Sequence, residues 1–277
     1  MPFKDKNVLI TGGTSGIGLE LARQLASMGA QLFILARSAD NLEEVRAELQ
    51  RGFPGNYQVF SVDVSDAEQV STAISQIIEL WGVPDVVINS AGIAHPGYVQ
   101  DLDMDIFHWM MDVNYFGTVN VTKALLPGMI ERGSGYIVNI ASMSAVIGLL
   151  GYSAYGASKF ALRGYSDALR MEMKPHGIHV SIVYPADTDT PQLHYENTYK
   201  PQELKKIINM LPATDPVPPD KVAGQILKGI EREQEVIIPD TGMIFLFKLV
   251  NILGNGVYPL LDWFYRRARD DGQSASD

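Results

Sequence analysis

The chain has 277 residues, of which 46% are hydrophobic and 19% charged, so it can bury a substantial core in one main domain. Its formal net charge of -10 argues against a nucleic-acid partner, because no local basic patch offsets the repulsion from phosphates. The absence of cysteine removes disulfides and thiolate chemistry, and the five histidines lack zinc-binding spacing, so no metal site is predicted.

Short β-branched runs alternate with longer amphipathic stretches, which is typical of a parallel sheet with crossover helices on both faces. Seven strands are predicted, at Asn7–Ile10, Gln31–Ala36, Tyr57–Val62, Asp85–Asn89, Gly135–Ile140, His179–Tyr184 and Glu235–Ile238. Helices are predicted at Gly16–Met28, Asn41–Gln50, Asp66–Leu80, Phe107–Arg132, Tyr155–Met173 and Pro219–Arg232. Asp40 and Asp66 are the predicted N-caps of the second and third helices. The predicted fold class is α/β, with a doubly wound, seven-stranded parallel sheet.

A glycine-rich turn follows the first strand and leads directly into a helical pattern. Glycines at positions 12, 16 and 18 permit a tight turn, let the backbone approach a pyrophosphate and aim a helix N-terminus at it. A plain strand–helix connection is the alternative, but the strand before and the helix after are what a dinucleotide site requires. The residues expected to contact the cofactor here are Gly12, Thr14, Ser15, Gly16, Ile17 and Gly18.

The second strand ends at Arg37 and Ser38 without the acidic residue that would bind the ribose 2′-hydroxyl of NAD. Arg37 can form a bidentate pair with a 2′-phosphate, and Ser38 can donate a further hydrogen bond. The alternative is a solvated arginine at a strand end. The presence of Arg37 and Ser38 at this strand end, without an acidic residue, favours NADP(H) over NAD(H).

Small and polar residues also follow the third and fourth strands. The carboxyl ends of the strands form the edge at which ligands bind in open α/β sheets. The residues expected at the cofactor from these two strand ends are Asp63, Val64, Asn89, Ala91 and Gly92.

Tyr155 and Lys159 open a predicted helix and share one of its faces, because they are four residues apart. A tyrosine with an ordinary pKa of about 10 is a poor acid–base catalyst at neutral pH, and an adjacent ammonium favours its ionised form. We therefore expect Lys159 to lower the pKa of Tyr155. The pattern taken alone is common on helices that have no catalytic role.

Three further polar residues precede this pair. Ser142, at the end of the fifth strand, can donate to a carbonyl oxygen, although it can also act as a strand-end cap and Ser144 is a rival for its role. Asn114 lies inside the long predicted helix, where its amide can bend the helix, position a water or simply be a buried hydrogen-bonded group.

The order of these motifs over residues 5–240 resembles the short-chain dehydrogenase/reductase family, whose T-G-x-x-x-G-x-G, N-S-A-G and Y-x-x-x-K patterns are all present. The resemblance implies a Rossmann-like single domain with a catalytic tetrad of Asn114, Ser142, Tyr155 and Lys159. It implies hydride transfer from NADPH to a ketone, with the proton coming from Tyr155. Lys159 would tune Tyr155 and hold the nicotinamide ribose, and Asn114 would support a water. It also implies a homo-oligomer paired through the helices at 107–132 and 155–173.

The stretch Ala186–Pro218 follows the sixth strand and is expected to form a substrate lid that contains a short helix at Gln202–Met210. Ala186 departs from the Pro-Gly that most family members carry at this point. The run from Pro185 to Pro191, followed by Glu196-Asn197, resembles the branch of the family that reduces 3-ketodihydrosphingosine. The residues that the resemblance places near the nicotinamide are Pro185, Thr188 and Thr190.

The segment from Met243 to Tyr265 is strongly apolar but interrupted by polar residues, and arginines follow it. We expect no bilayer-spanning helix here, because no uninterrupted apolar run reaches the roughly 20 residues needed. Aromatic residues with a basic flank suit peripheral contact with a membrane, and packing on the sheet or a dimer interface are the alternatives. Residues 1–240 are thus predicted to form the catalytic unit and residues 241–277 an apolar extension with a polar tail.

The leading hypothesis is NADPH-dependent reduction of a long-chain sphingoid ketone, in the course of sphingolipid synthesis. The rival enzymes act on another lipophilic carbonyl, such as a steroid, a retinoid or a 3-oxoacyl compound. A protein that senses NADPH without turnover is the alternative from another class. Only six mostly polar residues precede the first strand, so we expect no signal peptide and a location on the cytoplasmic side of a membrane.

Overall fold

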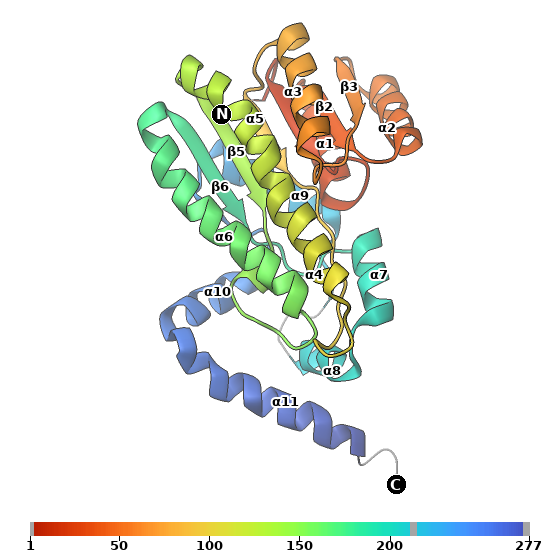
Figure 1. Cartoon of the computed structure of the whole chain (residues 1–277), viewed down its shortest axis with the longest axis vertical. Coiled ribbons are helices and arrows are strands. Elements are labelled where there is room, and N and C mark those ends of the chain that lie inside the picture. The colour runs from red at the N-terminus through yellow and green to blue at the C-terminus, as the bar shows by residue number, and fades with distance from the viewer. Residues whose placement is uncertain (1–2, 211–214, 274–277) are drawn as a thin grey trace.

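The computed structural model describes residues 3–210 and 215–273. Its strands form one parallel sheet in the order β3-β2-β1-β4-β5-β6-β7 (Figure 1). The strands are β1 (Asn7–Thr11), β2 (Gln31–Ala36), β3 (Tyr57–Ser61), β4 (Val86–Asn89), β5 (Gly135–Ile140), β6 (Ile178–Val183) and β7 (Val236–Ile237). The predicted doubly wound, Rossmann-like sheet of seven strands is confirmed.

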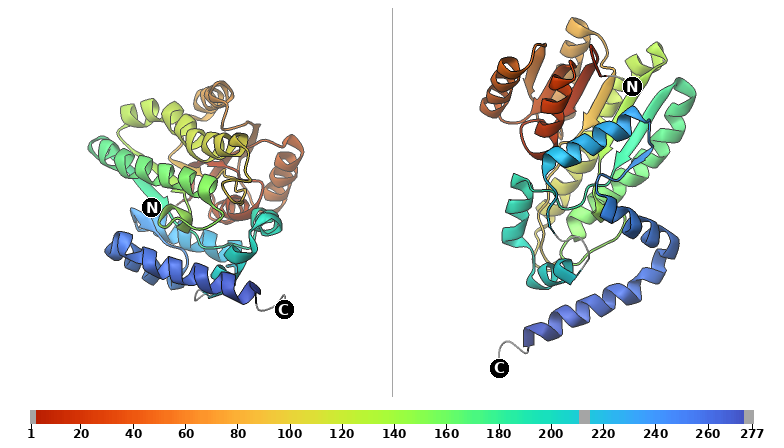
Figure 2. Two further views of the ribbon diagram at one scale, coloured as in Figure 1. Left: turned by 60° about the horizontal axis from the view of Figure 1, so that its bottom comes forward. Right: turned by 180° about the vertical axis from the view of Figure 1, so that it is seen from behind.

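Helices cover both faces of this sheet (Figures 1 and 2). One face packs on α1 (Gly16–Ser27), α2 (Ala39–Gly52) and α9 (Pro219–Glu231). The other packs on α3 (Ala67–Trp81), α5 (Gly117–Arg132) and α6 (Ser153–Met173). Successive side chains of a strand point to opposite faces, so Val8 and Ile10 of β1 enter the first core while Leu9 enters the second.

One of the two predicted N-caps is confirmed by the observed helix boundaries, and the other is wrong. Asp66 is confirmed, because its carboxylate accepts hydrogen bonds from the backbone N–H groups of Glu68 and Gln69 at 2.9 and 3.0 Å. Asp40 is wrong as the N-cap of α2. The helix begins at Ala39, and the hydroxyl of Ser38 accepts from the Asn41 N–H at 3.3 Å. A serine one residue before a helix satisfies the free N–H groups of its first turn just as an aspartate does.

The long helix predicted at Phe107–Arg132 is instead three consecutive elements. It starts at Met104 as α4 (Met104–Met111), widens into a π-turn at Asp112–Phe116 and continues as α5. A π-turn inserts an extra residue and often marks a functional position. Here it contains Asn114, the residue that was expected to disturb this helix.

The lid region carries two short helices, and the expected run at Gln202–Met210 is confirmed as α8. The first lid helix, α7 (Pro191–Tyr199), starts at a Thr190 hydroxyl that accepts from the Leu193 N–H at 3.3 Å. Part of the predicted lid, residues 211–214, lies outside the described residues.

The C-terminal segment forms α10 (Thr241–Leu253) and α11 (Tyr258–Gln273), joined by a 3₁₀ turn. Both lie beyond the carboxyl ends of β5 and β6, and α11 crosses beneath the main body in Figure 1. Arg163 of α6 donates to Asn251 at 2.8 Å, and Lys206 of α8 donates to the Ala268 carbonyl at 3.0 Å. The extension therefore packs on the catalytic unit through part of its surface.

The expectation that this segment is too interrupted to span a bilayer needs correction. By length and composition, the helical stretch Thr241–Arg269 is sufficient to cross a membrane, since one 18-residue window has a mean hydropathy of 1.5. The isolated Lys248 and Asp262 do not lower the average enough to prevent this. The described helix is nevertheless divided at Gly254, whose φ of 50° ends α10.

Candidate active site

A cavity of about 500 Å³ opens at the carboxyl edge of the sheet. It is lined by residues at or just after the carboxyl ends of β1 to β6. Residues of the segment after β6 and of the C-terminal helices complete the lining. Of the site residues predicted from the sequence, all but Asn89 and Asn114 line it. One continuous space therefore joins the predicted cofactor end to the predicted catalytic end.

The glycine-rich turn has no room for side chains. Gly12 and Gly16 have φ angles of 68° and 53°, in the left-handed region that favours glycine. A Cβ on Gly18 would lie 2.3 Å from the Gly12 carbonyl oxygen, so the start of α1 packs directly on the turn. Ser15 provides no side-chain cap, which leaves the first N–H groups of α1 available to an anion. These features fit a dinucleotide diphosphate.

Arg37 is exposed at the end of β2, beside the N-terminus of α2. Within the described part of the chain no carboxylate is paired with its guanidinium, which leaves it available to an anionic ligand. The Ser38 hydroxyl accepts from the α2 backbone, and its own hydrogen can still be donated. Both groups are thus available to bind the 2′-phosphate of a cofactor ribose.

The next strand ends supply backbone and small side chains. Asp63 accepts two hydrogen bonds from Ser65, at 2.9 and 2.7 Å, which hold the loop after β3. Ala91 and Ser90 donate their backbone N–H groups to the Thr11 hydroxyl at 3.0 and 3.1 Å. Thr11 was not among the predicted site residues, although it opens the glycine-rich motif, and it ties that motif to the loop after β4.

Asn89 lies behind the cavity rather than on its lining. Its amide nitrogen donates to Asn139 at 2.9 Å and to Thr122 at 3.4 Å, inside the protein. Its side chain supports the cofactor edge of the sheet from behind, and a contact of Asn89 with the cofactor stays a prediction. The amide joins β4 to β5 and α5, just below the cofactor edge.

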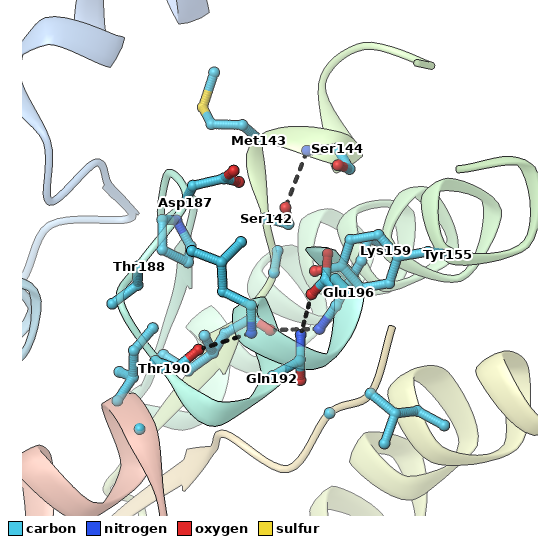
Figure 3. Close-up of a pocket in the computed structure, with 18 of the residues that line it drawn as sticks. Ser142, Met143, Ser144, Tyr155, Lys159, Asp187, Thr188, Thr190, Gln192 and Glu196 are labelled. Carbon is cyan, nitrogen blue, oxygen red and sulfur yellow. Dashed lines mark hydrogen bonds between the residues drawn. The ribbon is translucent and has the colours of Figure 1, made fainter. Parts of the chain in front are cut away.

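Tyr155 and Lys159 do share one face of α6, which begins at Ser153. Both are buried, with 8% and 4% of their surface exposed. The Lys159 ammonium donates to the Ile140 carbonyl at 3.0 Å and lies 5.8 Å from the centre of the Tyr155 ring. Two ionisable side chains are thus held together at the floor of the cavity (Figure 3).

The net shift in the pKa of Tyr155 is upward, opposite to the lowering that was expected from Lys159. Burial raises the pKa of Tyr155, and the Glu196 carboxylate raises it further. Burial likewise lowers the pKa of Lys159 to about 8. Desolvation disfavours both charged forms, and the ammonium is directed to the Ile140 carbonyl rather than to the phenol oxygen. Tyr155 is therefore held in its protonated form.

Ser142 rather than Ser144 is the serine that acts on Tyr155. A hydrogen bond from Ser142 lowers the pKa of Tyr155, against the larger effect of burial. The Ser142 oxygen also accepts from the Ser144 backbone N–H at 3.1 Å, which orients it (Figure 3). Ser142 is thus positioned to share a carbonyl oxygen with the tyrosine hydroxyl.

The Asn114 side chain holds the loop beside Tyr155 and Lys159. Its oxygen accepts from the Ile93 N–H at 2.8 Å, and its nitrogen donates to the Ile93 carbonyl and to Ser158, both at 2.9 Å. The amide is therefore fully engaged. The water that the family resemblance places at Asn114 stays a prediction.

The segment that follows β6 forms the other side of the cavity. Thr188 and Thr190 both line the cavity, and a Cβ on Gly16 would lie 2.9 Å from the Thr190 methyl group. Ala186 keeps a negative φ, so the glycine common in the family is not required here for its conformation. The lid also brings in Glu196, which was noted only as part of a sequence resemblance.

The far wall of the cavity is apolar and comes from elements distant in the chain. The lid helix α8 contributes Ile207 and Ile208. The C-terminal helices and their connecting turn contribute Met243, Leu246, Val257, Leu260, Leu261 and Phe264. An apolar chain attached to a reacting group at Tyr155 would find a matching surface here.

Comparison with known proteins agrees with this geometry. Residues 6–200 match the model of the short chain dehydrogenase family. The 3-ketodihydrosphingosine reductase of Bos taurus is 40% identical over 226 residues, which is 80% of this chain and 67% of that protein. The protein of that name in Dictyostelium discoideum is 36% identical over 280 residues, covering 95% and 82%. A short-chain dehydrogenase from Sphingobium yanoikuyae, solved with NADPH, has 26% identity and a TM-score of 0.78 over 92% of this chain and 95% of its own.

Proposed function

Because the chain belongs to the short-chain dehydrogenase family, we propose that it reduces 3-ketodihydrosphingosine to dihydrosphingosine with NADPH. The observation that carries this proposal is the single cavity that joins Tyr155 to an apolar wall. The names of the relatives at 36–40% identity support the same substrate class.

The cofactor end of the cavity supports NADPH. The glycine-rich turn and the start of α1 would receive the diphosphate, and Arg37 with Ser38 would receive the 2′-phosphate. Bound NADPH would supply the hydride that reaches the ketone carbon. Thr190, packed near Gly16, would close the lid over this part of the site.

The chain itself would control the oxygen of the ketone. Ser142 and Tyr155 would both donate to that oxygen, and Tyr155 would then transfer its proton as negative charge develops. The phenol is protonated before the reaction, and the hydrogen bond from Ser142 favours release of its proton by lowering the pKa of Tyr155 against the effect of burial. The nearby Lys159 ammonium would stabilise the tyrosinate that forms, and Asn114 would support a water, as the family resemblance implies.

The hydrocarbon tail of the substrate would lie along the wall formed by α8, α10 and α11. This assigns the extension at 241–277 a part in the site, while residues 1–240 supply the catalytic unit and the lid. Burial of a long alkyl chain is worth about 0.8 kcal/mol for each methylene, so such a wall would favour long ketones over short ones.

A substrate panel tests this function. Steady-state oxidation of NADPH should be fastest with 3-ketodihydrosphingosine, and at least tenfold slower in kcat/KM with a short ketone of the same head group, because several buried methylenes at about 0.8 kcal/mol each are lost. Steroid, retinal and 3-oxoacyl substrates test the rival enzymes. Tight NADPH binding without turnover of any ketone would instead favour the sensor.

We also propose that the outer face of the C-terminal helices contacts a membrane, on the cytoplasmic face. Phe245 and Ile252 of α10 are 72% and 82% exposed, and Trp263 of α11 is half exposed. Arg266 and Arg267 follow on the same segment and suit anionic head groups. Because the opposite side of these helices lines the cavity, a lipid substrate could enter from the bilayer surface.

Vesicle sedimentation tests this contact without removing the cavity wall. Changing Phe245, Ile252 and Trp263 together to aspartate should reduce binding to phosphatidylcholine–phosphatidylserine vesicles at least about tenfold, since each buried apolar side chain contributes about 1.5–3 kcal/mol. The matched control changes Leu80, Val99 and Met104, which are similarly exposed but lie outside the C-terminal helices. Equal sedimentation of the two triple variants would contradict the proposal.

Pairing of two copies through α5 and α6 stays a prediction. It is supported by large apolar side chains that these helices expose, among them Ile130, Phe160 and Met171.

A further inference from the structure

Glu196 of the lid helix α7 is a buried carboxylate beside the catalytic pair (Figure 3). Only 6% of its surface is exposed, and it lines the same cavity as Tyr155. One carboxylate oxygen accepts from the Tyr152 hydroxyl at 2.6 Å, and the other accepts from the Gln192 side chain at 3.0 Å. Both oxygens are therefore held, and the carboxylate faces the site in a fixed orientation.

Among the residues that the structure describes, none forms an ion pair with Glu196. Two ammonium groups attract it from a distance: that of Lys200, which pairs with Asp187 at 3.3 Å, and that of Lys159, which donates to the Ile140 carbonyl at 3.0 Å. Tyr152 and Gln192 contribute hydrogen bonds without charge. A carboxylate buried in this way is costly unless a positive partner joins it, and burial accordingly raises the pKa of Glu196.

Tyr152 connects Glu196 to Tyr155. Tyr152 lies three residues before Tyr155, and their ring centres are 5.5 Å apart. The Tyr152 hydroxyl donates a hydrogen bond to the Glu196 carboxylate. In the ketone of the proposed function, the amino group is on the carbon next to the carbonyl. A substrate whose carbonyl oxygen meets Tyr155 and Ser142 thus has its ammonium within a few atoms of the reacting centre.

We propose that Glu196, positioned by Tyr152 and Gln192, forms the subsite that binds the ammonium group of the substrate. This inference rests on the proposed function and names the group that selects an amino ketone among long-chain ketones. The apolar wall recognises the tail, and Glu196 recognises the charge at the head. Neutral ketones of equal length lack that ion pair and would be reduced less efficiently.

The test compares 3-ketodihydrosphingosine with 1-hydroxyoctadecan-3-one, which has hydrogen in place of the amino group. Both have the same chain length and are presented in the same carrier. For the unaltered enzyme, kcat/KM should be about 10- to 100-fold higher for the amino ketone, as expected for a charge-assisted hydrogen bond. In Glu196→Gln this ratio should fall to near one, whereas Glu196→Asp should restore part of it.

Glu203→Gln is the matched control. Glu203 also lies on a lid helix and accepts from a tyrosine hydroxyl, that of Tyr98 at 2.5 Å, but it does not line the cavity. Its replacement should leave the ratio of the two substrates as it is in the unaltered enzyme. If Glu196→Gln fails to fold, Tyr152→Phe keeps the test decisive, since loss of the positioning hydroxyl should lower the same ratio.

The outcomes separate this inference from the proposed function. An unaltered enzyme that reduces neither long ketone with NADPH overturns the function. An enzyme that reduces both equally well overturns only the Glu196 subsite. A folded Glu196→Gln variant that binds NADPH and loses both substrates to the same extent overturns the subsite as well, because the effect would not depend on the ammonium.

Discussion

Tyr155→Phe should lower kcat for ketone reduction by about 10²- to 10⁴-fold, the range for loss of a positioned proton donor. The change removes only the hydroxyl, and the buried ring keeps its place beside Lys159. The NADPH dissociation constant, measured by fluorescence titration, should change by less than about threefold, because nearly all proposed cofactor contacts lie elsewhere in the cavity. The proposed mechanism requires a large loss of kcat together with intact cofactor binding.

Tyr165→Phe is the control for this variant. Tyr165 lies on the same helix, is partly buried and does not line the cavity. Its replacement should leave kcat close to that of the unaltered enzyme. Normal turnover by Tyr155→Phe would remove this residue from the mechanism and leave Ser142 as the remaining hydroxyl donor in the cluster.

Arg37→Asp should weaken NADPH binding by at least about 100-fold while affecting NADH much less. The expected size follows from the loss of a charge-assisted, bidentate contact of about 1.5–3 kcal/mol and the new repulsion between carboxylate and 2′-phosphate. Dissociation constants for both cofactors give the measurement directly. Arg37→Ala separates the two contributions, since it removes the attraction without adding a negative charge.

Arg51→Asp controls for the change of net charge. Arg51 is an exposed arginine near the end of α2 and lies outside the cavity. The ratio of NADPH to NADH affinity should be unaltered in this variant. If Arg37→Asp also leaves that ratio unaltered, the 2′-phosphate is recognised by another group.

Where the relevant interactions are local, the sequence predicted the molecule well. The strands follow from short apolar runs, and the dinucleotide turn follows from the spacing of its glycines. Tyr155 and Lys159 share a face because four residues make about one turn of a helix. Each of these depends on groups only a few residues apart.

Errors arose where two local patterns compete or where burial decides. Ser38 and Asp40 are both good N-caps, and the start of α2 at Ala39 selects the serine. The spacing of Tyr155 and Lys159 indicated a lowered tyrosine pKa. In the folded chain, desolvation and the charge of Glu196 raise it instead.

The sequence by itself determined the sheet, the glycine-rich turn and the placing of Tyr155 and Lys159 on one helix face, because each depends on residues close together in the chain. Only the tertiary structure decided that the lid places Glu196 beside Tyr155 and that α10 and α11 form one wall of the cavity. The physical reason is that these contacts join segments far apart in the chain. Which side chains are buried, and which charges lie close together, is decided only when the chain folds.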